Sequence, residues 1–291
     1  MKFDIDFINR QLYKLFIFTL LVLIFRLKLK EIKAKVSIII PTYNRGNLIG
    51  NSIKSVLNQT YKYLEVIVVD DGSTDNTIEE INKIEDERVR YIKLKQNSGG
   101  SNARNIGMIN ATGKYISFQD SDDIYYPDKI ETQLKNIINK HSNLDFCKIK
   151  VNFNSSHSQY YPNIRQEKSI QNGNLFNELI SRGNFISTQA ILAKKEFIIK
   201  YLFDPKMPRL QDYDLILRMI PNVRISYTSN VLVELNLQDD SVTLSQKKLK
   251  KAVNILLKKK FNFNSNQTEL FTSYLNLILS TLPKKIKKGQ T

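Results

Sequence analysis

The chain has 291 residues, of which 42% are hydrophobic, and a formal net charge of +16 at pH 7. These values are those of a globular protein with a sizeable core, and they exclude wholesale disorder. The single cysteine, Cys147, excludes an intrachain disulfide, and the 44 basic against 28 acidic residues predict an anionic partner: a nucleic acid, a membrane surface or a phosphorylated substrate.

Residues 1–34 form an apolar and basic N-terminal segment. The apolar run over residues 15–25 is followed by Arg26, Lys28 and Lys30, and it is much shorter than the roughly 20 residues that a membrane-spanning helix needs. The pattern predicts a helix that dips into a membrane and is anchored by basic side chains. A helix buried against the protein or a partner is one alternative, and a true span is another.

From residue 36 onward, strand and helix patterns alternate, which predicts an α/β fold with a mostly parallel sheet. The β-branched runs at residues 36–40 and 64–69 predict strands that are buried on both faces. Thr74 or Asp75 is expected to cap the helix after the second strand. The expected helices cover residues 47–59, 76–84, 102–110 and 128–140, and the further expected strands cover 89–93, 114–118 and 146–153.

The second half of the chain is less regular. A polar loop is expected over residues 154–174, a strand over 187–193 and a helix over 211–220. Because no linker is recognisable before about residue 245, we expect one domain over residues 35–245. Residues 246–291 are expected to form a basic helical C-terminal extension, whose lysine-rich face is either simply solvated or attached to an anionic membrane.

Polar residues follow the second strand, at the edge where open α/β sheets bind ligands. Residues 68–75 read VVDDGSTD, and Asp71 could accept hydrogen bonds from a ribose or a base. An Asp-Gly turn that caps a helix is the structural alternative, with Gly72 allowing the turn. The phosphate-binding GxGxxG pattern is missing after the first strand, so a hydride-transfer enzyme is not expected.

A cluster of carboxylates follows the fourth strand, where residues 120–123 read DSDD. Alternate residues of an extended segment point the same way, so Asp120 and Asp122 could face one ligand. Mg²⁺ and Mn²⁺ prefer oxygen ligands, often one or two carboxylates together with substrate phosphates. A solvated acidic turn is the alternative, because the DxD pattern alone is common.

Four segments in this order resemble glycosyltransferase family 2, the inverting, nucleotide-sugar-dependent family with the GT-A fold. They are residues 36–44 (VSIIIPTYN), 69–75 (VDDGSTD), 97–105 (NSGGSNARN) and 120–123 (DSDD). The resemblance covers roughly residues 35–245. It implies a GT-A, Rossmann-like α/β fold, in which helices flank a mixed, mostly parallel sheet, here with helical N- and C-terminal extensions.

The resemblance also implies roles for individual residues. Asp120 and Asp122 match the family's DxD pair and would hold Mn²⁺ or Mg²⁺, with Asp122 as the main metal ligand. Seven residues, Asp120 included, would contact the nucleotide sugar. They are Pro41, Tyr43, Asp71, Asn97, Gly100, Arg104 and Asp120.

Residues 210–218 (LQDYDLILR) look like the family's acidic motif, usually Glu-Asp, on a helix at the acceptor site. Gln211 replaces the Glu, whereas Asp212 keeps the position of the general base that takes the proton of the acceptor hydroxyl. Asp214 and Arg218 are four residues apart on this helix, which predicts a structural salt bridge. Gln238 stands where family members often carry a histidine, so this position offers no histidine as a third protein ligand to the metal.

The resemblance implies a metal-dependent inverting glycosyltransferase that moves a sugar from a nucleotide diphosphate sugar, by family habit a UDP-sugar, to a hydroxyl of a glycan or lipid-linked acceptor in surface polysaccharide synthesis. The basic and apolar ends predict a cytoplasmic protein, peripheral on the inner face of the cell membrane. The alternative is a catalytically inactive family member that acts as a nucleotide-sugar-binding partner subunit. A nucleic-acid partner is not expected, because the basic residues gather at the two ends without aromatic platforms.

Overall fold

The computed structural model describes residues 13, 16–23, 33–154, 156–237 and 245–282 of a chain that forms two units, Met1–Ala34 and Lys35–Thr291. In the first unit, residues 16–23 are helical and expose apolar side chains such as Phe16 and Phe18. Within the described ranges, no helix combines the length and apolar character that crossing a membrane requires. The basic residues that follow this stretch lie outside the described residues, so the N-terminal prediction stays untested.

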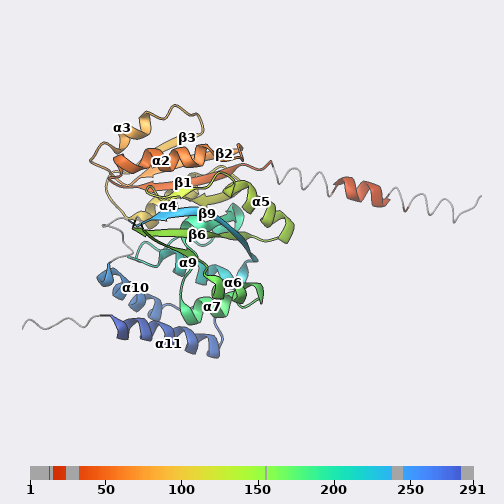
Figure 1. The fold of residues 1–291 in the computed structure, drawn as a ribbon, viewed down its shortest axis with the longest axis vertical. Helices are drawn as coiled ribbons and strands as arrows, with labels where there is room; N and C mark the ends of the chain where they lie inside the picture. The colour runs from red at the N-terminus through yellow and green to blue at the C-terminus, as the bar shows by residue number, and fades with distance from the viewer. Residues whose placement is uncertain (1–12, 14–15, 24–32, 155, 238–244, 283–291) are drawn as a thin grey trace, which may run out of the picture. The chain divides into compact units, whose positions relative to one another are not determined.

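The first half of the second unit contains a parallel sheet (Figure 1). Its strands are β1 (Val36–Thr42), β2 (Leu64–Asp70), β3 (Val89–Lys93) and β4 (Tyr115–Phe118). They run parallel in the order β3-β2-β1-β4. Every residue of β1 and β2 is buried, as expected for strands covered on both faces. Because the strands are parallel, the segments that follow β1, β2 and β4 meet at one edge of the sheet.

Helices connect these strands. They are α2 (Gly46–Leu57), α3 (Thr77–Asn82) and α4 (Gly100–Asn110). Asp75, rather than Thr74, accepts the first-turn N–H of α3, from Thr77 at 3.1 Å. Gly107 lets α4 lie directly on β1, because a Cβ atom there would come within 2.4 Å of Ile39 Cγ2. α4 therefore covers the sheet closely.

The second half extends the sheet with strands of both directions. Its main elements are β5 (Ile124–Tyr125), α5 (Lys129–Lys140), β6 (Leu144–Asn154), η1 (Thr188–Ala190), β8 (Ile191–Lys194), α8 (Lys195–Ile198), α9 (Gln211–Met219), η2 (Ile220–Asn222) and β9 (Ile225–Asn236). β8 pairs antiparallel with both β4 and β6, while β6 pairs parallel with β9. The result is the mixed α/β sheet with flanking helices that the sequence predicts.

The prediction of a polar loop over residues 154–174 is wrong for most of this range. β7 (His157–Tyr161) pairs antiparallel with β6, and α6 (Ile164–Gln171) follows it. Because β7 is an exposed edge strand, it lacks the alternation of apolar and polar residues that marks a half-buried strand. α6 starts with a capping box between Asn163 and Gln166. The strand expected over residues 187–193 is also partly wrong, since η1 occupies its first part.

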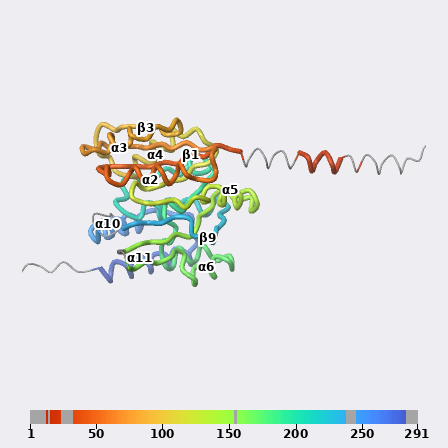
Figure 2. Tube along the Cα trace, turned by 45° about the horizontal axis from the view of Figure 1, so that its top comes forward, coloured from red at the N-terminus to blue at the C-terminus, as the bar shows by residue number. Residues whose placement is uncertain are grey.

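Two C-terminal helices pack against the rest of this unit at the end of the sheet far from β3 (Figures 1 and 2). They are α10 (Gln246–Lys258) and α11 (Ser265–Thr281). α11 lies beside α7 (Leu175–Arg182). The contact requires Gly183, because a Cβ atom there would lie 1.9 Å from the Tyr274 hydroxyl oxygen. The basic extension is thus attached to the α/β unit by close packing.

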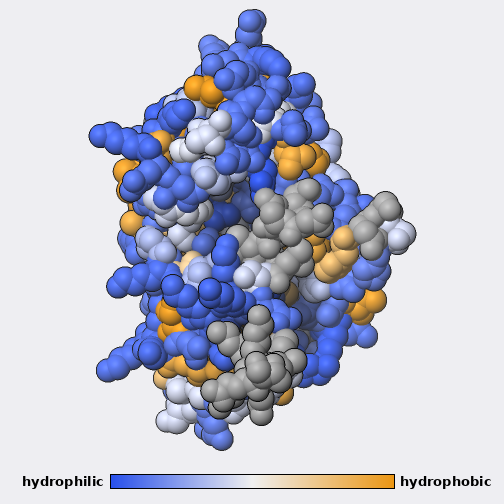
Figure 3. All heavy atoms as spheres, turned by 90° about the vertical axis from the view of Figure 1, so that its left-hand side faces the viewer, coloured by the Kyte–Doolittle hydropathy of each residue, from blue (hydrophilic) through white to orange (hydrophobic). Residues whose placement is uncertain are grey.

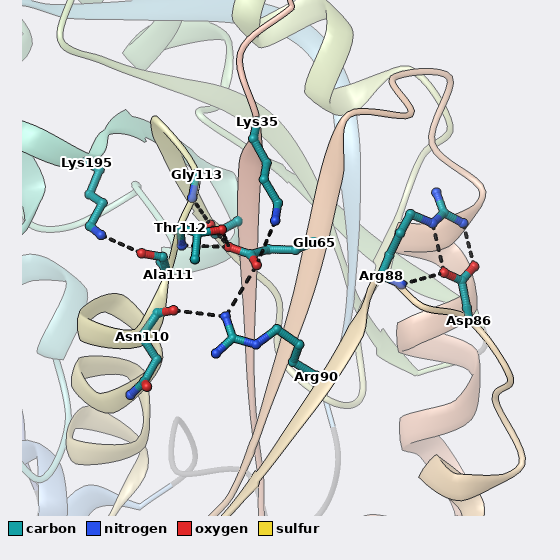
Figure 4. Close-up of polar contacts among 11 residues, drawn as sticks. Lys35, Glu65, Asp86, Arg88, Arg90, Asn110, Ala111, Thr112, Gly113 and Lys195 are labelled. Atoms are coloured by element: carbon teal, nitrogen blue, oxygen red, sulfur yellow. Dashed lines mark hydrogen bonds and ion pairs between the residues drawn. The ribbon is translucent and has the colours of Figure 1, made fainter.

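At the amino ends of the parallel strands, Glu65 of β2 joins several segments through polar contacts (Figure 4). Its side chain is 3% exposed and forms ion pairs with Lys35 at 3.1 Å and Arg90 at 3.4 Å. It also accepts hydrogen bonds from Ser37 Oγ at 2.6 Å and from the Thr112 N–H at 2.7 Å. Burial alone would raise the pKa of Glu65, but these donors outweigh it and lower the pKa to about 2.

Candidate active site

All of the predicted site residues line a single cleft at the carboxyl ends of β1, β2 and β4. The cleft has a volume of about 700 Å³, which is within the usual range for small-molecule and cofactor sites. The surface on this side of the molecule is mostly hydrophilic (Figure 3). The predicted residues in the wall are Pro41, Tyr43, Asp71, Asn97, Gly100, Arg104, Asp120, Asp122 and Asp212. The structure therefore brings them together, while their individual roles stay predictions.

Asp71, at the end of β2, holds the glycine-rich loop that forms one side of the cleft. Its carboxylate accepts hydrogen bonds from the Ser98 N–H at 2.8 Å and the Gly99 N–H at 2.6 Å. Gly99 has φ +92°, a conformation that glycine adopts without steric cost. This turn places Asn97 and Gly100 in the cleft wall. The predicted contact of Asp71 with a ribose or base would have to share the carboxylate with these donors.

Arg104 of α4 connects the two acidic motifs. Its Nη2 donates to Asp120 Oδ1 at 2.6 Å, and its Nη1 donates to Gln211 Oε1 at 3.1 Å. Gln211 occupies the position where the resemblance leads one to expect a Glu. Because an amide oxygen also accepts a hydrogen bond from a guanidinium group, this replacement keeps the link between α4 and α9.

Gln189 is a site residue that the sequence did not predict. Its Nε2 donates to Asp120 Oδ2 and to Asp123 Oδ2, at 2.6 Å in each case. Asp123 is 3% exposed and also accepts a hydrogen bond from the Asn236 N–H at 3.0 Å. Its burial raises its pKa well above the usual value, and the charges of Asp120 and Asp122 act in the same direction. Asp123 and Gln189 thus order the acidic loop from inside.

Asp122 and Asp120 fit a divalent metal that arrives with a phosphate-bearing substrate. Among the residues that the structure describes, no group of three or more His, Cys, Asp or Glu side chains could hold a metal ion. Asp122 and Asp120 both line the cleft, and Mg²⁺ sites commonly combine one or two carboxylates with substrate phosphates. Gln238, which stands where family members often carry a histidine, lies outside the described residues.

Asp212 lies in the first turn of α9 and in the cleft wall. Leu210, two residues before Asp212, has φ +59°, so a sharp turn leads into this end of the helix. Burial raises the pKa of Asp212 to about 6, and repulsion from Asp120 acts in the same direction, while Arg104 opposes it. A carboxyl group whose pKa lies near neutral pH is well matched to proton abstraction.

The predicted salt bridge on α9 is confirmed. Arg218 Nη2 lies 3.0 Å from Asp214 Oδ2, four residues earlier on the helix. Asp214 is fully buried, so it faces the protein interior, whereas Asp212 faces the cleft. The two acidic residues of α9 therefore have different environments.

Comparison with known proteins identifies the family. Residues 37–198 match the family described as Glycosyl transferase family 2. This chain belongs to that family. A glycosyltransferase of Haemophilus influenzae is 33% identical over 226 residues, which cover 75% of this chain and 84% of that protein. A glycosyltransferase of Rickettsia typhi is 38% identical over 215 residues, which cover 72% of this chain and 65% of that protein.

Other relatives of this family 2 chain are matched over shorter stretches. TuaG of Bacillus subtilis, named as a glycosyltransferase of teichuronic acid biosynthesis, is 43% identical over 105 residues, which cover 35% of this chain and 42% of that protein. The matched part spans between 24% and 65% of the length of four rickettsial relatives.

Two solved structures share the fold of this family 2 chain. TarS of S. aureus in complex with UDP-GlcNAc has a TM-score of 0.65 at 19% identity, covering 85% of this chain and 73% of that one. The mannosyltransferase PcManGT of Pyrobaculum calidifontis, in complex with GDP-Man and Mn²⁺, has a TM-score of 0.59 at 17% identity, covering 84% and 68%. The predicted family and GT-A fold are confirmed.

Proposed function

We propose that this protein is a metal-dependent inverting glycosyltransferase that transfers a sugar from a nucleotide diphosphate sugar to a hydroxyl group of an acceptor. One observation carries the proposal: a single cleft joins the DxD carboxylates Asp120 and Asp122 with Asp212, a carboxyl group whose pKa is raised to about 6. Family membership supplies the reaction class. The cleft supplies a carboxylate for a metal and another for proton transfer.

The donor is proposed to be a UDP-sugar. Tyr43, which lines the cleft and is 42% exposed, offers a ring for contact with the base. The buried Thr42 hydroxyl, also in the cleft wall, has no hydrogen-bond partner among the described residues, and a polar ligand would supply one. TarS and PcManGT were solved with UDP-GlcNAc and GDP-Man respectively, which supports a nucleotide sugar as the donor class.

The proposed reaction is a single displacement. Asp212 accepts the proton of the acceptor hydroxyl while the hydroxyl oxygen forms a bond to the sugar C1, on the face opposite the diphosphate. The bond between C1 and the diphosphate oxygen breaks, and its electron pair leaves with the diphosphate. When bound, Mn²⁺ or Mg²⁺ would neutralise charge on the leaving group; Asp122 and Asp120 would hold it. Arg104 fixes the Asp120 carboxylate through their 2.6 Å ion pair.

The test of this function is a screen of UDP- and GDP-sugars in the presence of Mn²⁺ or Mg²⁺, with release of the nucleoside diphosphate as the measurement. We expect release with at least one donor and its loss when the metal is chelated. Absence of release from every donor, with glycan and lipid-linked acceptors present, would contradict the proposal. The alternative of an inactive partner subunit predicts nucleotide binding without release, and Gln211 does not favour it, since this side chain still accepts the bond from Arg104.

We further propose a glycan or lipid-linked acceptor in surface polysaccharide synthesis, and a peripheral position on the cytoplasmic face of the membrane. The name of TuaG refers to teichuronic acid biosynthesis, which supports the acceptor class. On the outer face of α10, Lys247, Lys250, Lys251 and Lys258 line a surface groove of about 430 Å³. Each basic residue near an anionic membrane surface contributes about 1 kcal/mol of attraction.

Sedimentation with lipid vesicles tests the membrane proposal. The chain is expected to bind phosphatidylglycerol vesicles and not phosphatidylcholine vesicles, and the combined variant Lys247→Ala, Lys250→Ala and Lys251→Ala is expected to bind phosphatidylglycerol at least about tenfold more weakly. Equal binding to both lipids, or no loss in the variant, would contradict the electrostatic attachment.

A further inference from the structure

Lys248 belongs to the C-terminal extension, yet it lines the same cleft as Asp122 and Asp212. Residues four apart on a helix share a face, so Lys248 lies on the face of α10 that carries Ala252 and Leu256. Both of these side chains are fully buried against the domain. Lys248 is itself exposed, so it lies at the edge of the buried face, at the end of the helix that meets the cleft.

Several contacts fix the position of α10 relative to the cleft. At its start, the Ser245 side chain accepts the Lys248 N–H at 3.3 Å, and Arg209 Nη1 donates to the Ser245 carbonyl oxygen at 3.4 Å. Just past its end, Lys259 Nζ lies 2.5 Å from Oδ1 of the buried Asp214 on α9. α10 is thus attached at both ends to the segment that carries Asp212. Its first turn contributes Lys248 to the cleft wall.

The charges of the cleft give Lys248 a role. The Arg104 guanidinium group already donates hydrogen bonds to Asp120 and Gln211. The negative charge of Asp212 raises the pKa of Arg209, but the burial of Arg209 has the larger effect and lowers this pKa. Among the described residues, no hydrogen bond or ion pair involves the Lys248 ammonium group, which is exposed. Lys248 is therefore a cation in the cleft whose charge is available to a ligand.

We infer that Lys248 binds the diphosphate group of the nucleotide-sugar donor and stabilises the charge that develops on it as the bond to the sugar C1 breaks. This inference rests on the proposed function. The electron pair of the breaking bond passes to the leaving oxygen of the diphosphate, and an ammonium group beside that oxygen stabilises it electrostatically. A residue of the C-terminal extension thus completes the donor site.

Nucleotide binding, measured by titration calorimetry in the presence of Mg²⁺, tests this inference apart from turnover. The probes are UDP and GDP, with uridine and guanosine as the phosphate-free comparison. Lys248→Ala is expected to bind the preferred diphosphate about tenfold more weakly, with unchanged affinity for the nucleoside, because a charge-assisted phosphate contact is lost. Lys248→Arg is expected to restore most of the affinity. Lys260→Ala, which removes an exposed lysine just beyond the end of α10, is the matched control and should bind like the wild type.

The possible outcomes separate the inference from the proposed function. If the wild type binds UDP or GDP and Lys248→Ala binds it equally well, the inference is overturned while the proposed function stands. If Lys248→Ala weakens nucleoside and diphosphate binding alike, Lys248 does not act on the phosphates and the inference is again overturned. If the wild type binds neither diphosphate, the proposed function fails and the inference fails with it.

Discussion

At the residue scale, the site depends on carboxyl groups that share one cleft but differ in their surroundings. Asp212 is buried enough for its pKa to rise to about 6. Asp120 is held by Arg104 and Gln189 at 2.6 Å each. Asp122 lines the cleft, and its carbonyl oxygen accepts a hydrogen bond from Asn236 Nδ2 at 3.4 Å. These differences support the proposed roles, namely proton transfer by Asp212 and metal binding by Asp122, with Asp120 kept in a fixed orientation beside it.

Replacing Asp212 tests the proton-transfer role. Asp212→Asn keeps the size of the side chain but cannot accept a proton, so turnover is expected to fall by about a thousandfold. In the wild type, kcat/KM should rise with pH as Asp212 loses its proton around pH 6 and level off above it. The measurement is the rate of nucleoside diphosphate release between pH 5 and pH 8, with UDP or GDP affinity as the control for an intact site. A variant as active as the wild type, or a rate that falls through this range, would argue against Asp212 as the base.

Replacing Asp122 tests the metal site. Asp122→Ala is expected to lower metal-dependent turnover by at least about a hundredfold, because the ion loses its main protein ligand. Asp122 lies in the wall of the cleft, so the thermal unfolding midpoint should stay close to that of the wild type. Asp128→Ala, which removes an exposed carboxylate shortly after the acidic loop, is the matched control. Unchanged metal dependence in Asp122→Ala would return the acidic loop to a purely structural role.

Sequence patterns predicted the carboxylates and the edge of the sheet at which they lie. They did not predict Gln189, whose side chain joins two of these carboxylates. Asp120 and Asp123 are close together in the sequence, whereas Gln189 lies 69 and 66 residues away from them. A glutamine beside the apolar strand β8 is unusual, since strands buried in a sheet are mostly apolar. That pattern indicates a polar contact without indicating its partner, because the partner depends on how β8 pairs with β4.

At the scale of elements, the accuracy of the predictions depended on burial. β1 and β2 are buried along their whole length, so continuous apolar runs identified them within one or two residues. β7 is exposed and depends on pairing with β6, and its sequence carries no periodic signal. The sequence of α6 does carry a helix signal, namely the Asn-x-x-Gln capping box of Asn163 and Gln166. A pattern within one segment does not show which distant strand that segment pairs with.

The Glu65 cluster predicts a stability effect that is separate from the active site. Glu65→Gln is expected to lower the free energy of unfolding by about 2 kcal/mol at pH 7, because hydrogen bonds to a charged group are weakened. The pKa of Glu65 is about 2 in the folded protein, against 4.5 for a glutamate side chain surrounded by water. Its stabilising contribution is therefore complete above pH 4.5 and is lost as the pH falls toward 2.

Urea unfolding of the wild type and Glu65→Gln at pH 7, 5 and 3 measures this effect. The difference between the two proteins should be constant from pH 7 to 5 and should narrow at pH 3. Nucleotide affinity should not change, because Glu65 lies at the amino ends of the strands, away from the cleft. A difference that stays the same at all three pH values would show that the Glu65 charge does not stabilise the fold.

At the scale of the whole molecule, the Lys35–Thr291 unit combines a parallel half, a mixed half and two C-terminal helices around one cleft. The parallel half supplies Asp71 and Arg104, and the mixed half supplies Gln189 and Asp212. The C-terminal helices supply Lys248. The domain boundary expected near residue 245 stays a prediction, and α10, which follows it, lines the cleft through Lys248. In the proposed donor site, Lys248 would come from an element beyond the region that resembles the family.

The anomeric configuration of the product tests the central claim most directly. Once the donor screen has identified a substrate, proton NMR spectroscopy of the first transferred sugar, recorded before any mutarotation or further reaction, reports the configuration at C1. A single displacement with Asp212 as the base predicts that the configuration is inverted relative to the donor. A product that retains the configuration of the donor would contradict the account.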